Sequence, residues 1–530
     1  MSATETFGVA AVAAPHKLAA QSGLNALAQG GNAIEAMVAM AATIAVVYPH
    51  MNGIGGDGFW LIRDPKGKVR AIEACGYAGA LATLKFYRDH EHQAIPARGP
   101  HAALTVPGAI GGWIAALDLA KALGARLSLR DLLADAIRHA REGYPVSSSE
   151  ARTLPRDSTE FAALPGFAAT ILIDGKSPEA GDIRKLPALA GTLDQLANAG
   201  LADFYRGDVA REMAADLEKI GSPVTREDLR RYEAKWREPL SLKLAGRTHL
   251  NFPPPTQGLA SLLILGMFDR LGVKQRDSFE HLHGLIEATK RAFAIKDAVC
   301  TDFDRLRHDP QDFLAPAALE REASFISMKS AASFPLQQAK GDTIYMGAID
   351  GQGTAVSYIQ SIYWEYGSGC VLPKTGVLMQ NRGLSFSLDP DAVNPLAPGR
   401  KPFHTLNPAM TVFDDGRVMP YGTMGGDGQP QTQAQIMTRL MFGMGLAEAI
   451  DAPRFALGRT WGASLSLLAL ENRFDPSLVR ALERAGHEVA VHADGYADTF
   501  GHAGALIRYP KDGRVEAAHD PRADGGAMGI

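Results

Sequence analysis

The sequence is poor in cysteine and has no excess of basic charge. Its 530 residues include 3 cysteines, and 54 Lys and Arg stand against 58 Asp and Glu, a formal net charge of −4. Sparse cysteines without CxxC spacing argue against disulfides and zinc and fit a reducing compartment. A slightly acidic chain also lacks the basic field that nucleic-acid binding needs. We therefore expect no metal and no nucleic-acid partner.

Targeting and membrane signals are missing as well. The first eight residues contain no basic segment of the kind that begins a secretory signal. The apolar stretch from Ala33 to Tyr48 contains Glu35, and it is shorter than the roughly 20 residues that cross a bilayer. We expect a cytoplasmic protein that makes no membrane contact.

Nucleotide-binding motifs are absent too. The glycine-rich loop Asn52-Gly53-Ile54-Gly55-Gly56-Asp57-Gly58 follows a helical stretch and precedes a strand. A dinucleotide fingerprint has the opposite order, strand before helix. There is no Walker sequence, and His281-Leu282-His283 lacks the HExxH pattern of a zinc helix. We expect no cofactor.

Apolar residues make up 46% of the chain, enough for a large core. Their spacing predicts helices at 15–30, 32–47, 108–141, 255–297 and 432–445, and a hairpin at 59–72. The span from Ala315 to Gly341 is polar and has no clear period, so we expect a flexible tail there. Short strands follow it.

The most informative point is Asp342-Thr343, directly before an apolar strand from Ile344 to Ile349. If the bond before Thr343 is cut, its hydroxyl becomes a nucleophile and its freed α-amine a base. An α-amine has a pKa of roughly 7.7–8.0, which suits this task. The alternative is that Thr343 only begins a strand.

Downstream, Gly425 and Gly426 lie in the loop Gly422-Thr423-Met424-Gly425-Gly426-Asp427-Gly428, before a helical stretch. Paired backbone N–H groups that no side chain shields are suited to stabilising the oxyanion of acyl transfer. A plain glycine turn is the alternative.

With these motifs in order, the chain resembles the γ-glutamyltranspeptidase family from end to end. The resemblance rests on Gly30-Gly31-Asn32-Ala33-Ile34-Glu35-Ala36, Gly53 to Gly58, Thr105-Val106-Pro107-Gly108, Pro253-Pro254-Pro255-Thr256-Gln257-Gly258, Thr343, Asp350, Gly367-Ser368-Gly369, Gly425-Gly426, Asp451-Ala452-Pro453-Arg454-Phe455 and Asp520-Pro521-Arg522.

The resemblance implies a fold and a maturation route. Family members are α/β proteins with a four-layer αββα sandwich of the N-terminal-nucleophile hydrolase type, made as proenzymes that cleave themselves. Cleavage between Asp342 and Thr343 implies a large subunit of residues 1–342 and a small one of residues 343–530. The two form one domain and a heterodimer, which is open to further pairing.

The family's catalytic positions also carry over. Thr343 is implied as the nucleophile, and Gly425 and Gly426 as the oxyanion hole. Ser361 stands where the family has a threonine that hydrogen-bonds the nucleophile, and it keeps a hydroxyl there.

The charges of the implied substrate pocket differ from the family pattern. Leu84 stands in place of the arginine that holds the α-carboxylate, and the adjacent Lys85 is a partial substitute. Ser385 replaces the acidic residue that pairs with the substrate ammonium. Arg382 stands where the family has a neutral amide. This pocket favours a small carboxylate without an α-amine.

Other pocket positions differ too. Tyr363 replaces an asparagine, and His404-Thr405 replaces a pair of serines. Tyr363 contacts substrate or fills the hairpin, and His404 contacts substrate or packs in the core. The proline-containing loop from Leu388 to Lys401 takes the place of the family's active-site lid and is expected to be short and stiff.

Arg382 itself has two interpretations. It anchors a substrate carboxylate, or it pairs with Asp389 or Asp391 on a surface loop. In the first case the pocket is most similar to the oxamate amidohydrolase branch, which acts in purine breakdown. The alternatives are a γ-glutamyltranspeptidase or glutathione hydrolase with a remodelled pocket, and an uncleaved homologue that only binds a ligand.

Overall fold

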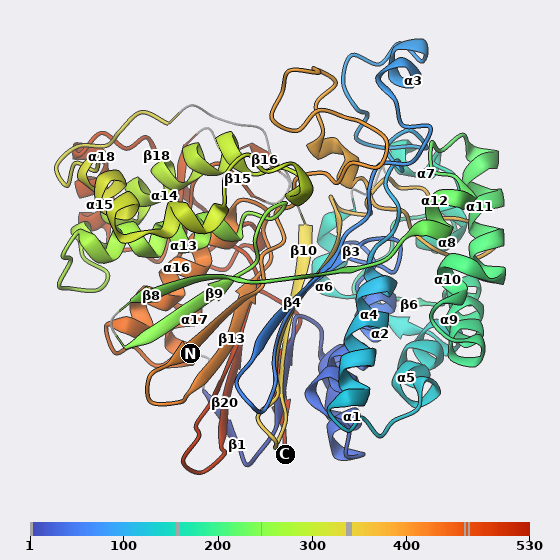
Figure 1. Cartoon of the computed structure of the whole chain (residues 1–530), viewed down its shortest axis with the longest axis horizontal. Coiled ribbons are helices and arrows are strands. Elements are labelled where there is room, and N and C mark those ends of the chain that lie inside the picture. The colour runs from blue at the N-terminus through green and yellow to red at the C-terminus, as the bar shows by residue number, and fades with distance from the viewer. Residues whose placement is uncertain (1–3, 155–158, 245, 335–341, 461–462, 465–466) are drawn as a thin grey trace.

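Two seven-stranded antiparallel sheets lie face to face in the middle of the molecule (Figure 1). The computed structural model describes residues 4–154, 159–244, 246–334, 342–460, 463–464 and 467–530. The first sheet has the order β21 (Gly526–Gly529), β2 (Ala11–Ala14), β10 (Asp342–Ile349), β11 (Ala355–Tyr363), β3 (Asp57–Arg63), β4 (Val69–Ala74) and β7 (Lys235–Arg237). The second has the order β1 (Glu5–Phe7), β20 (Val515–His519), β19 (Ala503–Arg508), β13 (Val418–Thr423), β12 (Ala409–Phe413), β9 (Arg247–Asn251) and β8 (Leu240–Leu244).

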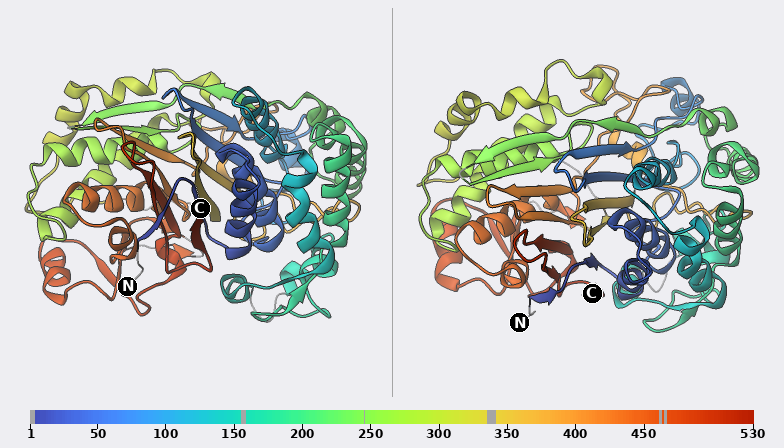
Figure 2. Two further views of the ribbon diagram at one scale, coloured as in Figure 1. Left: turned by 90° about the horizontal axis from the view of Figure 1, so that it is seen from below. Right: turned by 60° about the horizontal axis from the view of Figure 1, so that its bottom comes forward.

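Helices cover the outer face of each sheet, which makes four layers (Figure 2). On the first sheet lie α1 (Lys17–Ala28), α2 (Ala33–Val47) and α4 (Ala109–Ala122), followed outward by α5 (Leu129–Glu142), α9 (Pro187–Ala199), α10 (Asp203–Arg206), α11 (Asp208–Ile220) and α12 (Arg226–Arg231). The second sheet is covered by α13 (Gly258–Arg270), α14 (Phe279–Val299), α15 (Pro316–Ser324), α16 (Gly428–Met441), α17 (Leu446–Asp451) and α18 (Pro476–Arg484). The αββα sandwich is as predicted.

Shorter elements join these layers. They are α3 (Leu84–Asp89), β5 (Tyr144–Pro145), α6 (Ser148–Thr153), α7 (Thr159–Ala162), α8 (Phe167–Ile171), β6 (Ile183–Arg184), η1 (Phe303–Arg305), η2 (Pro310–Leu314), η3 (Arg382–Ser385), β14 (Phe455–Ala456), β15 (Arg459–Thr460), β16 (Ala463–Ser464), β17 (Leu468–Glu471), β18 (Val489–His492) and η4 (Asp498–Phe500).

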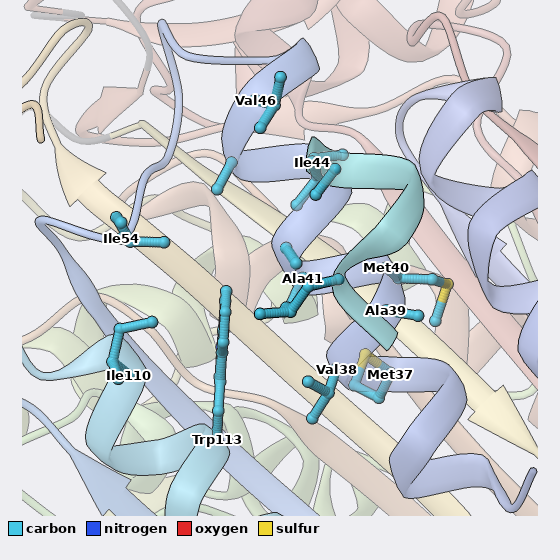
Figure 3. Close-up of a cluster of buried hydrophobic side chains, with 14 of the residues drawn as sticks. Met37, Val38, Ala39, Met40, Ala41, Ile44, Val46, Ile54, Ile110 and Trp113 are labelled. Atoms are coloured by element: carbon cyan, nitrogen blue, oxygen red, sulfur yellow. The ribbon is translucent and has the colours of Figure 1, made fainter. Parts of the chain in front are cut away.

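Every residue of helix α2 is buried. The helix is apolar on all its faces, as expected for a helix that is surrounded by other elements. It packs on α4 and the first sheet, where Met37, Val38 and Trp113 meet (Figure 3). Its start is a capping box: the Asn32 side chain accepts from the Glu35 N–H, and Glu35 accepts from the Asn32 N–H. Glu35 also accepts from two backbone N–H groups after α4, so its buried carboxylate is fully bonded.

The span expected to be a flexible tail is helical in part, which corrects that prediction. Helix α15 begins with Pro316, the position where proline is best tolerated, and buries Leu319 and Ala323. Two buried apolar residues four positions apart are too few to predict a helix from the spacing of apolar residues. Residues 335–341 lie outside the described part of the chain. Among the described residues, no helix has the length and apolar character to span a bilayer.

Candidate active site

Three neighbouring strands bring the candidate nucleophile and its surroundings to one end of the first sheet. Ser361 on β11 is the register partner of Asp57 on β3, and Thr343 lies on β10 at the same end. Side chains two apart on a strand share a face, so these three point the same way as Tyr345, Ile359 and Phe59. Those three are in the core between the two sheets. The site therefore lies at one end of the sheet interface.

Thr343 and Ser361 are both buried, and their hydroxyls meet. The Thr343 Oγ1 donates to Ser361 Oγ at 3.4 Å, and Ser361 Oγ also accepts from the Tyr363 N–H at 2.9 Å. The strand β10 begins at Asp342, so the Asp342–Thr343 bond is at the start of the ladder.

The glycine loop before β3 fits closely around Ser361. A Cβ on Gly56 would lie 2.1 Å from the Ser361 carbonyl oxygen, so only glycine is accommodated. The Gly56 carbonyl in turn accepts from the Gly108 N–H at 2.8 Å. Two sequence motifs, the glycine loop and Thr105 to Gly108, thus support the strand that carries Ser361.

Arg382, on η3, is buried beside this strand end. Its Nη2 donates to Thr405 Oγ1 at 3.4 Å, and its guanidinium carbon lies 3.7 Å from the centre of the Tyr363 ring. Its Nη1 has no hydrogen-bond partner among the described residues. In that part of the chain, Arg382 also forms no ion pair with Asp389 or Asp391. Burial lowers the pKa of Arg382 to about 10, so it remains a cation at neutral pH.

His404 is fully buried next to Asp57, a residue to which the sequence assigned no role. The Nε2 of His404 is 3.6 Å from Asp57 Oδ2, and its ring meets Phe59 edge-on. Within the described part of the chain, both ring nitrogens of His404 and the Oδ2 of Asp57 lack hydrogen bonds. Burial holds the pKa of His404 well below its usual value, so it is neutral.

The other Asp57 oxygen is firmly held. Oδ1 accepts from the backbone N–H groups of Gly76 at 3.0 Å and Gly108 at 3.1 Å. Burial raises the pKa of Asp57 to about 7, against the opposing effect of the Gly76 hydrogen bond. The only available sequence signal was an acidic residue inside a glycine loop, which is weak without its partner.

The glycine pair forms the tight turn before α16. Gly425 and Gly426 have φ of +116° and +53°, the left-handed region that favours glycine. In the described part of the chain, neither N–H donates to a backbone carbonyl. The Gln257 side chain donates to the carbonyls of Gly426 and Thr405, both at 2.7 Å, and so links this turn to the segment that contains His404 and Thr405.

A cavity of about 240 Å³ adjoins the site. Tyr363 and Ser385 line it, as do Val393 and Asn394 of the expected lid loop. Its lining further includes Phe293, Lys296, Asp297, Cys300, Phe334, Leu384, Phe403, Asp427 and Gly458. Tyr363 thus lies between this cavity and Arg382.

The cavity contains an ion cluster that the sequence did not reveal. Lys296 Nζ is 3.2 Å from both Asp297 Oδ1 and Asp427 Oδ1. Asp427 directly follows the glycine pair, so the cluster joins the turn to α14. Lys85, in contrast, is exposed and pairs with Asp89 at 2.5 Å, which makes the expectation that it substitutes for an arginine in the pocket wrong.

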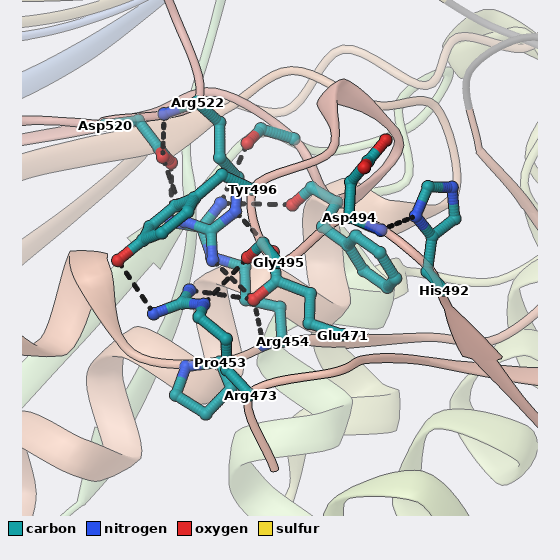
Figure 4. Close-up of polar contacts among 12 residues, drawn as sticks. Pro453, Arg454, Glu471, Arg473, His492, Asp494, Gly495, Tyr496, Asp520 and Arg522 are labelled. Atoms are coloured by element: carbon teal, nitrogen blue, oxygen red, sulfur yellow. Dashed lines mark hydrogen bonds and ion pairs between the residues drawn. The ribbon is translucent and has the colours of Figure 1, made fainter.

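A buried ion network supports the turn from the other side (Figure 4). Arg454 pairs with Asp520 at 2.6 Å, and Arg522 pairs with Glu471 at 2.7 Å and Asp520 at 2.9 Å. Arg454 also donates to the Gly501 carbonyl at 2.9 Å. The next residue, His502, accepts from the Met424 N–H, directly before the glycine pair. The motifs at 451–455 and 520–522 meet here.

One described cluster has the atoms of a metal site: His283, Glu287 and His487. However, His283 Nδ1 is already 2.8 Å from His487 Nε2, and Lys290 Nζ donates to Glu287 Oε1 at 2.7 Å. A cation therefore already neutralises the only carboxylate. The expectation that the protein uses no metal stays a prediction.

Comparisons with known proteins agree with this geometry. Residues 19–530 match the gamma-glutamyltranspeptidase family model. An oxamate amidohydrolase proenzyme of Klebsiella pneumoniae is 51% identical over 97% of both chains, and a glutathione hydrolase-like YwrD proenzyme of Bacillus subtilis is 39% identical over 98% of both. The crystal structure of a cephalosporin acylase from Bacillus halodurans superposes with a TM-score of 0.92, at 32% identity, over 100% of this chain and 97% of that one.

The fold and these matches define an N-terminal-nucleophile hydrolase that acts on amide C–N bonds. The chain belongs to the gamma-glutamyltranspeptidase family.

Proposed function

We propose that this chain is a self-processing amidohydrolase that cleaves the amide of a small carboxylate, with oxamate as its substrate. The observation that carries the proposal is a buried guanidinium, Arg382, which lies over Tyr363 at the end of β11 and whose Nη1 has no hydrogen-bond partner among the described residues. A carboxylate would supply that partner in a charge-assisted contact. The name of the relative from Klebsiella pneumoniae supports the same substrate.

Among the described residues that line the adjoining cavity, no unpaired carboxylate is available to an α-ammonium group. Ser385 replaces the expected acid, and the carboxylates of Asp297 and Asp427 in the adjoining cavity are both paired with Lys296. An unpaired buried charge costs several kcal/mol. Oxamate has one carboxylate and one primary amide and no ammonium, so it avoids this cost.

The proposed reaction follows from the assigned positions. Thr343 Oγ attacks the amide carbonyl, and the N–H groups of Gly425 and Gly426 stabilise the oxyanion. The α-amine of Thr343 takes the hydroxyl proton and passes it to the leaving ammonia. Water then attacks the ester, which releases the acid and restores the Thr343 hydroxyl. Ser361 orients the nucleophile, and Arg382, Thr405, His404, Tyr363 and Ser385 surround the substrate.

The test compares ammonia release from oxamate with cleavage of a γ-glutamyl chromogenic amide by the mature enzyme. We expect oxamate to be hydrolysed faster. Arg382→Met should raise KM for oxamate by about 30-fold or more, since losing a buried charged partner costs about 2–5 kcal/mol. Arg382→Lys keeps the charge without the planar fork and should lie between the two.

Two outcomes would overturn the proposal. Efficient turnover of glutathione without ammonia release from oxamate would restore the transpeptidase or glutathione hydrolase alternative. An uncleaved chain that binds oxamate and never releases ammonia would restore the alternative of a non-catalytic homologue. The expected cytoplasmic location and part in purine breakdown remain predictions, which cell fractionation and growth on purines as nitrogen source would check.

A further inference from the structure

The enclosure around Arg382 contains a carboxyl group of the protein itself, that of Asp57. The proposed reaction does not use it. Its Oδ1 is bonded to two backbone N–H groups, which fixes the side chain. Its Oδ2 is buried and has His404 Nε2 3.6 Å away, without a hydrogen bond from the described residues. The enclosure therefore brings together one guanidinium, one carboxyl group and a neutral imidazole.

We propose that Asp57 determines how readily the site accepts a negative charge, because its carboxylate must take up a proton when a substrate carboxylate binds at Arg382. The inference rests on the proposed function, in which Arg382 anchors the substrate. Two carboxylates cannot both stay ionised in one buried enclosure with a single guanidinium. The proton comes from solvent and attaches to Oδ2, the oxygen without a hydrogen bond.

Burial supports this role, because it raises the pKa of Asp57 to about 7 before any ligand is present. A bound anion adds repulsion and raises that pKa further. Below pH 7 the group is already protonated and binding costs nothing extra. Above pH 7 each bound anion must bring one proton, so affinity falls about tenfold per pH unit.

Other groups around Asp57 have different effects. Thr343, once freed, carries an α-amine that loses its charge at roughly pH 7.7–8.0 and so also weakens anion binding. Among the described residues, the other charged or titratable groups near Asp57 are Arg382, the neutral His404, and the buried Cys75, Tyr205, Tyr232 and Tyr358, with the Lys401 cation acting on His404 and Cys75. Burial raises the pKa values of Cys75 and the three tyrosines. Of these, only Asp57 and the amine change charge near neutral pH.

The test uses the mature enzyme and oxalate as the anionic probe. Isothermal titration calorimetry at pH 8, in two buffers of different ionisation enthalpy, should show uptake of close to one proton per oxalate bound. Asp57→Asn keeps an Oδ1 that accepts from Gly76 and Gly108. It should lower this uptake by close to one proton, which leaves only the fraction taken up by the Thr343 amine, and it should bind oxalate about tenfold more tightly than the wild type at pH 8, with equal affinity at pH 6.

The outcomes separate this inference from the proposed function. If the wild type hydrolyses oxamate and binds oxalate without proton uptake, Asp57 does not take up a proton on anion binding. The inference is then wrong, and the proposed function stands. Weaker oxalate binding by Asp57→Asn at pH 8 would also overturn it, because Asp57 would then only position His404. If the wild type neither binds oxalate nor hydrolyses oxamate, both proposals fail. The wild-type calorimetry decides the question even if the variant does not fold.

Discussion

Thr343 and Ser361 meet because of strand pairing. Adjacent strands β10 and β11 point both side chains into the sheet interface, and the Gly56 backbone presses against the Ser361 carbonyl from the other side. The hydroxyl–hydroxyl distance of 3.4 Å is long for an O–H···O bond. In the uncleaved chain the amine of Thr343 is still part of a peptide bond, so the general base does not yet exist. Ser361 is a side chain that already contacts the nucleophile in that state.

We expect Ser361→Ala to mature slowly and to lose about 10²-fold in turnover, the low end for acid–base assistance. Ser361→Thr is the matched control, because it keeps the hydroxyl on a strand that tolerates β-branching, and it should stay near wild type. The measurements are the rate at which the two fragments form and kcat for ammonia release. Unchanged rates in the alanine variant would leave Ser361 as a packing residue.

Single residues were predicted where a local pattern accompanied them. A threonine before a strand, a glycine pair before a helix and an arginine in place of an amide can all be read along the chain. Asp57 could not be recognised in this way, because its significance depends on His404, which reaches it only through the contact of the two sheets. The position of Lys85 could not be predicted either, because adjacency to Leu84 in the sequence does not show which side of a short helix faces solvent.

At the level of elements, the end of β11 connects the predicted cleavage bond with the proposed anion site at Arg382. Tyr363, its last residue, pairs in the ladder with Asp342, and it has φ of +83°, a conformation that costs about 1–3 kcal/mol. Its ring covers Arg382 and also lines the adjoining cavity. The proposed cleavage after Asp342 would separate Thr343 from the residue that pairs with Tyr363 in the ladder.

We therefore expect the uncleaved chain to be closed to anions. Thr343→Ala, which cannot mature, should bind oxalate at least tenfold more weakly than the mature enzyme in calorimetry. Adding Tyr363→Ala to that variant removes the ring over Arg382 and should restore binding. Adding Tyr363→Phe instead keeps the ring and should not. Equal oxalate affinity of Thr343→Ala and the mature enzyme would show that Tyr363 does not obstruct the site.

Element prediction succeeded where the period was strong and failed where contacts outside the element decide. Helices α1, α2 and α13 have long apolar patterns, and the hairpin of β3 and β4 has a turn of Asp, Pro and Gly. Helix α15 is short and depends on burying Leu319 and Ala323. Helix α16 begins at Gly428, before the expected start at Thr432, because the glycine turn leads directly into it.

At the scale of the whole molecule, the two predicted subunits are interleaved. Strand β10, from the later part of the chain, lies between β2 and β11, and β11 pairs with β3. In the second sheet β12 pairs with β9, and β1 pairs with β20. Every one of these seams except that of β10 with β11 joins residues before position 342 to residues after it. None of the ladders that join the two parts of the chain includes Asp342, so cutting the bond after it would leave them and the shared core in place.

We expect the purified chain to give two bands on a denaturing gel, residues 1–342 and 343–530, and one species with the mass of the whole chain in native mass spectrometry. Thr343 Oγ attacks the Asp342 carbonyl carbon, the C–N bond breaks, and the acyl group moves to oxygen while the α-amine is freed. Water opens the ester and leaves Asp342 with a carboxylate. Thr343→Ser keeps a hydroxyl and should still cleave, whereas Thr343→Ala should remain one chain. Cleavage of the alanine variant at this bond would rule out the mechanism, and separation of the two fragments without denaturant would show that the interleaved sheets do not hold them together.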